Sequence, residues 1–562
     1  MVESIRTSKL NNLSSYMIKR FILLLLLSTT QGLFCFGQNT DLQDNIRIRL
    51  ELDQPDVPLN VLQQELYAKG EIYHFYSNRL FNPVWTEKGV LTELAYELRF
   101  EINQSKFDGL NPQDYHLDLI NQFFFQFESN KKQATPNALD DLADVDLLLS
   151  DAFFHLAAHL EVGKVDPKKL AGDWEITTKI SKVSYPDLLK AAVEKKQIRQ
   201  TLETLYPTIT VYKKGREVIR GLDEIRKQDT LNWKAVKVSK TIKVGETHGG
   251  IPNLRERLAF WKFLEPYVFE DEKQYDSTMF LAVQKFQQRN GLEPDGALGK
   301  NTINALNQSP TDLIDKASVN MERLRWLPDT LRGAEMILVN IANYQLDYLS
   351  NRDTLFSTRV IVGKKYHESP IFSSAMSYIV FSPYWNLPTS IVRNEVMPAV
   401  RKNPNYLSQK NMEVVTFSGK AVDPASVNWS GKSIPYMVRQ KPGATNSLGL
   451  VKFMFPNEHS VYIHDTPARS LFTREDRALS HGCIRIQDPA TFAELLLRNN
   501  KAWTSDKINS AMHQNREEIV NLDRKIPVVL LYLTFWADSK GQGHFRQDIY
   551  DRDAEVLEAL RD

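Results

Sequence analysis

The segment between Ser460 and Gln487 holds Cys483, one of only two cysteines in the 562-residue chain, together with histidines and an arginine. A free thiol has a pKa of about 8.5 and is mostly protonated at neutral pH, so its use as a nucleophile requires a nearby base or cation. His464 can supply the base, and Arg485 can supply the cation. The planar guanidinium of Arg485 also fits a carboxylate. These residue types therefore predict a cysteine nucleophile that acts on a substrate with a free carboxylate.

Two short runs rich in β-branched residues, Ser460–His464 and Cys483–Gln487, must position these side chains. Such runs favour strands, and the polar segment between them favours a long surface loop. Side chains alternate between the two faces of a strand, so each run directs one set of residues toward a core. The core set is Val461, Ile463, Ile484 and Ile486. If the two strands are neighbours, the opposite faces gather Tyr462, His464, Cys483 and Arg485 on one patch.

Attack on an amide creates an oxyanion, which needs hydrogen-bond donors. The backbone N–H groups of Gly482 and Cys483 can serve, because glycine permits the sharp turn that exposes them. The hydroxyl of Tyr462 can add a further donor. We therefore expect the oxyanion site at the turn that precedes the second strand.

Other interpretations of the same residues stay open. A lone cysteine is often a buried small hydrophobic residue, although glycine, histidine and arginine neighbours do not suit an apolar core. A metal site is the other alternative, but the spacing of its ligands matches no established zinc pattern. Those ligands would be His459, His464, His481 and Cys483. The sequence favours the nucleophile, with no metal and no cofactor.

The run Ser480-His481-Gly482-Cys483-Ile484-Arg485, with Tyr462-Ile463-His464 upstream, resembles the signature of the L,D-transpeptidases, cysteine enzymes that cross-link peptidoglycan. Cys483 follows His464 by 19 residues, a separation similar to that in the large Gram-negative branch. The resemblance implies that Cys483 is the nucleophile and His464 the base. It places Ser480, Gly482, Tyr462 and Arg485 around the oxyanion and substrate, gives His481 a loop-ordering role, and implies inhibition by carbapenems.

The same resemblance implies the reaction. Cys483 attacks the carbonyl of the third residue of a donor tetrapeptide stem, D-alanine leaves, and the side-chain amine of an acceptor stem resolves the thioester. With water in place of the amine, the protein would be an L,D-carboxypeptidase or would release wall-bound protein. An inactive wall-binding scaffold is a third hypothesis. The joint presence of Tyr462, His464, Cys483 and Arg485 argues against it, whereas transfer and hydrolysis both stay open.

The composition is that of an ordinary globular protein, with 42% hydrophobic residues, 25% charged residues and a net charge of +1. Such a charge gives no argument for a nucleic-acid partner. A polymer partner is therefore not recruited by bulk charge.

The N-terminal residues have the layout of a secretory signal. Lys19 and Arg20 precede an apolar run, Phe21–Leu27, that is too short to span a bilayer comfortably. We expect a signal peptide at 1–37, cleaved after Gly37, and a periplasmic protein; a start at Met17 would give a conventional signal length. The bulky Phe34 disfavours lipoprotein processing at Cys35. Removal of the signal would leave Cys483 as the only cysteine, unable to form an internal disulfide.

A chain of this length predicts three or four domains. Helical periodicity dominates as far as Lys234, and one helix is marked by i, i+4 spacing and a stop at Gly163. The residues with that spacing are Leu148, Ala152, Leu156 and Leu160. His155 and His159 lie on the same helix, and we interpret them as surface or packing residues. The order of these pieces resembles the scaffold domain of large L,D-transpeptidases, expected at 38–238.

A small helical module is expected at 239–310. Phe280, Val283 and Phe286 predict a helix that ends at Asn290-Gly291, and Asn301 or Thr302 can cap a second short helix. The run from Phe286 to Leu306 resembles the three-helix peptidoglycan-binding module of cell-wall enzymes. A spacer without binding function is the alternative.

From about Val319 the sequence favours β-structure, and strands are predicted at Ile337–Ile341, Thr358–Gly363 and Pro527–Thr534. The resemblance implies a mostly β catalytic domain at 316–550, with a capping subdomain at 391–443 and a C-terminal helix at 551–562. A polar segment of that length is usually a lid or disordered. Trp385 lines the substrate groove or fills a core. The expected fold class is multidomain α+β.

Overall fold

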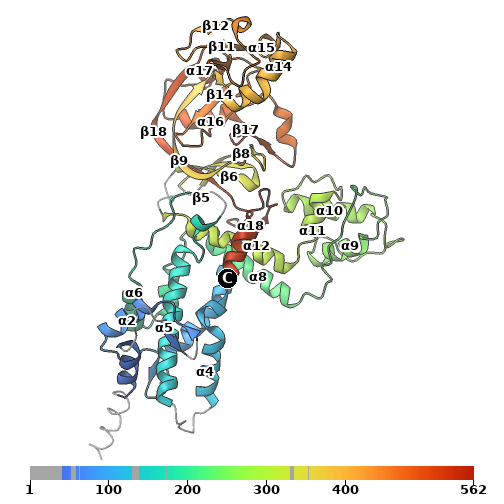
Figure 1. The fold of residues 1–562 in the computed structure, drawn as a ribbon. Coiled ribbons are helices and arrows are strands. Elements are labelled where there is room, and N and C mark those ends of the chain that lie inside the picture. Colours follow the sequence, from blue (N-terminus) through green and yellow to red (C-terminus); the bar gives the residue numbers. More distant parts are fainter. Residues whose placement is uncertain are drawn as a thin grey trace, which may run out of the picture. The chain divides into compact units, whose positions relative to one another are not determined.

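The computed structural model of the protein describes residues 41–51, 59–61, 64–129, 138–170, 174–329, 335–351 and 353–562. The expected signal peptide, its cleavage site and Cys35 lie outside these ranges. The chain divides into two compact units (Figure 1). The first comprises Met1–Lys164 and Ile180–Pro207, and the second comprises Val165–Lys179 and Thr208–Asp562. No helix within the described ranges is long and apolar enough to cross a membrane.

The first unit is mostly helical. Its helices are α2 (Lys69–Asn78), α3 (Glu93–Gln104), α4 (Leu117–Ser129), α5 (Ala138–Val162), α6 (Tyr185–Lys195) and α7 (Ile198–Glu203). Its short strands are β1 (Asn60–Val61), β2 (Gln64–Glu65), β3 (Thr86–Glu87) and β4 (Val90–Leu91). The predicted helix and its stop are confirmed, because α5 ends before Gly163, which has a φ of 95°. Its apolar stripe is buried at Leu148, Ala152, Leu156 and Leu160.

The two histidines of α5 are packing residues. The ring centroids of His155 and His159 lie 4.2 Å apart, and the Nδ1 atom of His159 lies 3.0 Å from the Tyr115 hydroxyl. A carboxylate on the same helix, Asp146, is buried and accepts hydrogen bonds from the Tyr76 hydroxyl at 2.6 Å and the Trp85 amide at 2.9 Å. The Asp146 carboxylate, the Tyr76 hydroxyl and the Trp85 amide thus satisfy one another inside the helical core, whereas His155 Nδ1 is buried without a hydrogen-bond partner among the described residues.

A small helical module begins the second unit after α8 (Thr210–Lys227). It contains α9 (Ile251–Phe260), α10 (Ser277–Arg289) and α11 (Lys300–Leu306), packed around one apolar cluster. Neither Asn301 nor Thr302 caps the short helix, because α11 begins at Lys300 with Gly299 in the N-cap position. The Thr302 hydroxyl is instead buried and accepts a hydrogen bond from Gln287 Nε2 at 3.1 Å.

The expectation of β-structure from about Val319 is wrong, because Val319 lies inside α12 (Pro310–Trp326). A capping box between Ser309 and Asp312 starts this helix, and Pro310 occupies its first turn. The helix is held within the unit by charged groups: Arg323 Nη1 donates to Asp553 Oδ1 at 2.6 Å, at the start of α18 (Asp553–Arg561). The strands begin only after α12.

A ten-stranded sheet forms the β-rich part of the second unit, and its path closes because β14 pairs with both β15 and β9. The order along the path is β14 (Val451–Met454), β15 (Ile463–His464), β17 (Ile484–Ile486), β8 (Asp353–Gly363), β7 (Gln345–Ser350), β6 (Glu335–Asn340), β18 (Glu518–Leu531) and β9 (Ile371–Phe381). β5 (Trp174–Glu175) joins β9, and β16 (Ala478–Ser480) joins β8. Outside the path lie α16 (Pro489–Leu497), α17 (Ser505–Met512), β19 (Phe535–Ala537) and β20 (Gly543–Phe545). The multidomain α+β class is confirmed.

The segment expected as a cap is folded. It forms a sheet with the order β10 (Trp385–Asn386), β13 (Met437–Gln440), β11 (Met412–Val415) and β12 (Ala421–Val422). The helices α13 (Thr389–Ile391), α14 (Met397–Lys402) and α15 (Tyr406–Gln409) complete it around an apolar core of its own. Trp385 is half-buried and packs against that core, which favours the packing interpretation over a groove-lining one.

Candidate active site

The two runs that carry the candidate site residues are adjacent strands. β15 and β17 pair in parallel, with Ile463 opposite Ile484 and His464 opposite Arg485. The core set predicted from the alternation is buried: Val461, Ile463, Ile484 and Ile486. The strands are shorter than expected, and Ser460 cannot belong to one because its φ is 56°. The pairing places Tyr462, His464, Cys483 and Arg485 on one patch.

Cys483 is partly buried in this patch and contacts Tyr462. Its Sγ lies 3.9 Å from the Ser460 carbonyl oxygen and accepts hydrogen bonds from the Tyr462 hydroxyl and amide. Burial raises the pKa of the Cys483 thiol, and this effect outweighs the Tyr462 hydrogen bonds and the positive charge of Arg485, which lower it. The expectation of an enlarged thiolate fraction is therefore wrong, because desolvation dominates.

His464 is buried and held in one tautomer. Its Nδ1–H donates to the Asp465 carbonyl oxygen at 2.5 Å, since a carbonyl can only accept. Burial, and then the charge of Arg485, lowers the pKa of His464 to about 3, although the carbonyls of Asp465 and Leu448 act in the opposite direction. Among the described residues, no hydrogen bond joins His464 to the Cys483 sulfur. The imidazole is therefore neutral and retains a lone pair.

Arg485 presents a guanidinium without an anionic partner. Its Nε is buried without a hydrogen-bond partner, and none of the ion pairs in the described part of the chain includes this residue. Burial lowers the pKa of Arg485, and a charge on Cys483 would raise it. A buried donor without a partner costs free energy, so the site favours an anion beside Arg485.

The turn before Cys483 offers fewer oxyanion donors than expected. The Gly482 amide already donates to Ser480 Oγ at 3.0 Å, and that hydroxyl donates to the Cys483 carbonyl oxygen at 2.6 Å. The expectation that the Gly482 amide serves as a donor is therefore corrected. The Cys483 amide remains as a candidate, whereas the Tyr462 hydroxyl is also engaged because it donates to the Cys483 sulfur. Burial, and then a negative charge on Cys483, raises the pKa of Tyr462, so its hydroxyl keeps its proton.

Two residues that sequence reasoning missed hold this turn in place. The buried Ser369 hydroxyl donates to the Gly482 carbonyl oxygen at 2.7 Å and accepts from the Gly363 amide at 3.0 Å. The Tyr550 hydroxyl donates to the Gly363 carbonyl oxygen at 2.6 Å and accepts from the Ser369 amide at 3.2 Å. Ser369 and Tyr550 lie far from Cys483 in the sequence, so no local pattern indicates them.

The histidines of the metal alternative have separate partners. His481 is exposed and stacks on His367 at a centroid distance of 5.0 Å. His459 Nε2 lies 2.7 Å from a carboxylate oxygen of Glu175. In the parts of the chain that the structure describes, no group of three or more histidine, cysteine or acidic residues could hold a metal ion.

The segment that returns from the cap reaches His464. A Cβ on Gly449, whose φ is 63°, would lie 2.3 Å from Asp465 Cγ, so only glycine permits this approach. The Leu450 amide donates to Asp465 Oδ2 at 2.8 Å. Asp465 in turn carries the carbonyl that fixes the His464 tautomer. The segment that follows the cap therefore contacts Asp465, the residue whose carbonyl orients His464.

Three family models match the chain. An L,D-transpeptidase catalytic domain matches residues 334–508 and includes both active-site strands. Residues 334–508 belong to the L,D-transpeptidase catalytic domain family. A "Putative peptidoglycan binding domain" matches residues 247–306, and a scaffold domain matches residues 70–218. The recognition of the family from the residues around Cys483 is thus confirmed.

Similar proteins carry the same family name. A Haemophilus influenzae protein named "Putative L,D-transpeptidase" is 34% identical over 248 residues, which are 44% of this chain and 50% of that protein. The chain therefore spans about half the length of this curated relative. A solved L,D-transpeptidase from Stackebrandtia nassauensis is 14% identical, covers 53% of this chain and 97% of its own, and has a TM-score of 0.19. A solved L,D-transpeptidase from Xylanimonas cellulosilytica is 13% identical. The match covers 53% of this chain and 100% of that chain, with a TM-score of 0.17.

The buried, neutral His464 predicts an acid sensitivity of the L,D-transpeptidase domain. A histidine whose pKa is lowered in the fold binds fewer protons than in the unfolded chain, so the free energy of unfolding falls as pH drops below the unfolded pKa of about 6.5. With a folded pKa of about 3, this loss extends from about pH 6.5 to about pH 3. Between pH 6.5 and pH 5 we expect the wild-type protein to lose about 1.5 kcal/mol more than His464→Gln. Urea unfolding at both pH values measures the difference, and equal losses would contradict the neutral assignment.

Proposed function

We propose that the protein is a peptidoglycan L,D-transpeptidase that works through a thioester on Cys483. The sulfur attacks the carbonyl carbon of the third residue of a donor tetrapeptide stem, the bond to D-alanine breaks, and D-alanine leaves with a proton. The side-chain amine of an acceptor stem then attacks the thioester, the C–S bond breaks, a new amide forms, and the proton lost by the amine returns to the sulfur to restore the thiol. The parallel pairing of the His464 and Cys483 strands in the matched domain is the observation that carries this proposal.

The protonation states suggest how the thiol is activated. At neutral pH the resting pair is a thiol and a neutral imidazole, because burial raises the pKa of Cys483 and lowers that of His464. In our proposal His464 accepts the thiol proton as the carbon–sulfur bond forms and later delivers it to D-alanine. The carboxylate of the stem lies against Arg485, whose buried Nε has no hydrogen-bond partner among the described residues.

Product analysis separates transfer from hydrolysis. The protein is incubated with purified disaccharide tetrapeptide, and mass spectrometry then distinguishes a cross-linked dimer from a shortened monomer. We expect the dimer, since the folded cap can order the donor stem and limit access of water. Shortened monomer alone would make the protein an L,D-carboxypeptidase, and unchanged substrate would contradict both enzymatic readings. We propose that the reaction takes place in the periplasm, an assignment supported by the peptidoglycan substrate and by the predicted signal peptide.

The proposed roles of Arg485 and His481 predict different losses. Arg485→Ala should lower kcat/KM by a factor equivalent to about 2 to 4 kcal/mol of transition-state stabilisation, because the substrate loses a buried charged partner. His481→Ser should cost about 1 kcal/mol, because this exposed side chain only orders its loop through His367. Both variants are measured with one tetrapeptide donor. A dead His481→Ser enzyme beside a normal Arg485→Ala enzyme would reverse these roles.

A carbapenem should acylate Cys483. Its strained carbonyl can mimic the donor amide, so attack by the same sulfur opens the ring and leaves a thioester. Intact-protein mass should rise by one drug molecule, and peptide mapping should place the addition on Cys483. The Cys483→Ala variant is the control and should stay unmodified. An unmodified wild-type spectrum after long incubation would count against a reactive nucleophile.

A further inference from the structure

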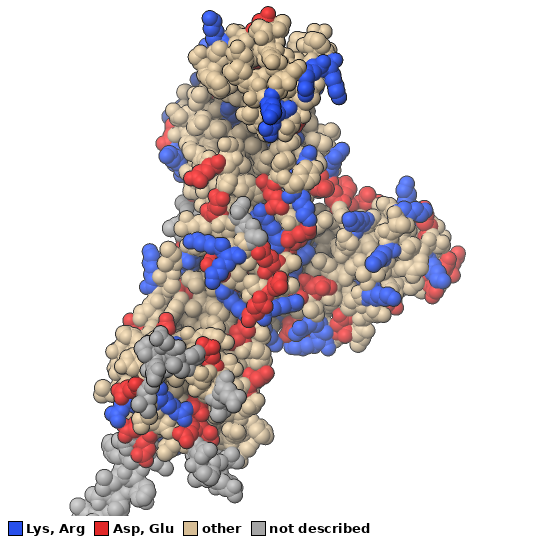
Figure 2. Space-filling model, in the orientation of Figure 1, with Lys and Arg blue, Asp and Glu red and all other residues tan. Residues whose placement is uncertain are grey.

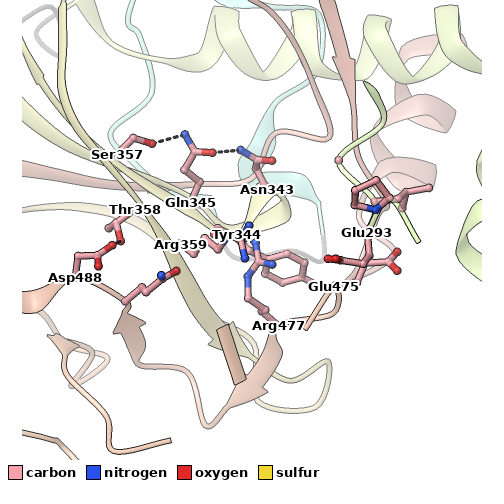
Figure 3. A pocket seen from close by; sticks show the side chains of 14 residues that line it. Glu293, Asn343, Tyr344, Gln345, Ser357, Thr358, Arg359, Glu475, Arg477 and Asp488 are labelled. Carbon is pink, nitrogen blue, oxygen red and sulfur yellow. Dashed lines mark hydrogen bonds between the residues drawn. The ribbon is translucent and has the colours of Figure 1, made fainter. Parts of the chain in front are cut away.

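A pocket of about 420 Å³ lies where the helical module meets the catalytic sheet, within the second compact unit (Figure 3). The module contributes the turn Gly291–Pro294, β8 contributes Ser357–Arg359, and the segments next to β7 and β16 contribute Tyr344 and Arg477. The two walls are joined, since Asn301 Nδ2 of the module donates to Glu475 Oε1 at 2.9 Å. A volume of this size suits a small ligand or the end of a peptide.

Arg359 and Arg477 line one side of the pocket together with Asp488, whose carboxylate accepts a hydrogen bond from the Thr358 hydroxyl at 2.7 Å. The guanidinium of Arg477 is held by the carbonyl oxygens of Val360 at 3.3 Å, Arg474 at 2.8 Å and Tyr344 at 3.4 Å. Burial, and then the charge of Arg359, lowers the pKa of Arg477. Neither arginine takes part in an ion pair within the described ranges, and Arg359 donates only to a backbone carbonyl. A ligand carboxylate would relieve the repulsion between the positive charges of Arg359 and Arg477.

The opposite side of the pocket is acidic. Figure 3 shows Glu293 and Glu475 close together beyond the ring of Tyr344. Burial raises the pKa of Glu475, and the charges of Asp295 and Glu293 raise it further. A ligand ammonium would relieve this repulsion in the same way. The charge separation is local, since acidic and basic residues are otherwise mixed over the visible surface (Figure 2).

A neutral wall completes the pocket. Gln345 Nε2 donates to Ser357 Oγ at 2.8 Å, and Asn343 Nδ2 donates to Gln345 Oε1 at 2.9 Å. Amide and hydroxyl groups of this kind can exchange hydrogen bonds with peptide groups. The pocket therefore combines sites for a carboxylate, an ammonium and amides.

We propose that this pocket binds a zwitterionic peptide stem, with its terminal carboxylate on Arg359 and Arg477 and its side-chain ammonium on Glu293 and Glu475. The identification of the ligand as a peptidoglycan stem rests on the proposed function, whereas its zwitterionic character rests on the pocket. The bound stem is anchored and does not react, because its amine is held by carboxylates.

The pocket lies close to the candidate nucleophile. Gln487 lines it and follows Cys483 by four residues, which corresponds to roughly 13 Å at about 3.3 Å per strand residue. The amide of Gln487 donates to the Arg359 carbonyl oxygen at 3.1 Å, so the strand of Cys483 continues directly into the pocket wall. A stem anchored there raises the local concentration of neighbouring stems at Cys483. The module thereby acquires a binding role in place of a spacer role.

Zero-length coupling tests the proposal. Carboxyl groups of the full-length Cys483→Ala protein are activated with a carbodiimide, the excess reagent is quenched, and the free tetrapeptide is added. Peptide mapping by mass spectrometry then locates the coupled amine. We expect coupling at Glu293 or Glu475, with a yield at least tenfold lower in an added Arg359→Glu variant. A tetrapeptide with an amidated C-terminus should show a similar loss, because its carboxylate is removed.

A matched charge reversal controls the test. Arg516 is an exposed arginine that does not line the pocket, so Arg516→Glu should leave the coupling yield within twofold. Absence of coupling at both carboxylates, or an unchanged yield in Arg359→Glu, would overturn the pocket proposal. Turnover by the wild-type protein is measured in parallel. Turnover without coupling overturns only the pocket, whereas coupling without turnover overturns only the proposed enzymatic function.

Discussion

Replacement of Cys483 by alanine should abolish turnover of the tetrapeptide stem. We expect kcat/KM to fall by at least about 10⁴-fold, because the thioester cannot form without the sulfur and the remaining groups only bind and orient the substrate. Release of D-alanine from purified disaccharide tetrapeptide measures this loss. The side chain is small and only partly buried, so the free energy of unfolding should change by less than about 1.5 kcal/mol.

Cys483→Ser is the matched control for this experiment. It keeps the size of the side chain and its contact with Tyr462, but its hydroxyl is a far weaker nucleophile at the same position. Its turnover should therefore also be very low. Wild-type turnover in Cys483→Ala would exclude the nucleophile assignment.

Replacement of His464 by alanine should have the next largest effect, a loss in kcat/KM of about 10²- to 10⁴-fold. The physical reason is the resting state of the pair: the thiol is protonated, so attack depends on a group that removes the proton. The same assay of D-alanine release measures the loss.

His464→Gln separates the loss of the base from a change in packing. Glutamine can donate to the Asp465 carbonyl oxygen as the imidazole does, but it cannot accept a proton at neutral pH. It should therefore be nearly as slow as His464→Ala. A His464→Gln enzyme with normal turnover would show that another group activates Cys483.

Strand alternation predicted the composition of the candidate site. The β-branched runs around His464 and Cys483 predicted which side chains face the core and which face the patch. Side chains alternate along a strand, so a shift of one residue would turn every apolar side chain away from the core. The helix of Leu148 to Leu160 was predictable for the same reason, with a period of 3.6. Local periodicity of this kind predicts structure well because the apolar side chains of one face must all be buried in the same core.

Features set by distant contacts were not predictable. Ser369 holds the Gly482 turn through a hydrogen bond across 113 residues of sequence, Tyr550 supports it through a hydrogen bond to Gly363 across 187 residues, and neither belongs to a local pattern. The state of the thiol was also missed. The charge of Arg485 can be inferred from the sequence, but the burial that outweighs it depends on the packing around Cys483. The helix through Val319 was missed because its buried charged residues resemble a surface pattern.

The acyl-enzyme itself tests the central claim most directly. The wild-type protein is mixed with tetrapeptide stem, quenched in acid within the first turnover, and analysed by intact-protein mass spectrometry and peptide mapping. We predict a mass increase equal to the stem less D-alanine, located on the peptide that contains Cys483 and absent from Cys483→Ala. Turnover in which no such adduct accumulates on Cys483, or in which the adduct lies on another residue, would contradict the account.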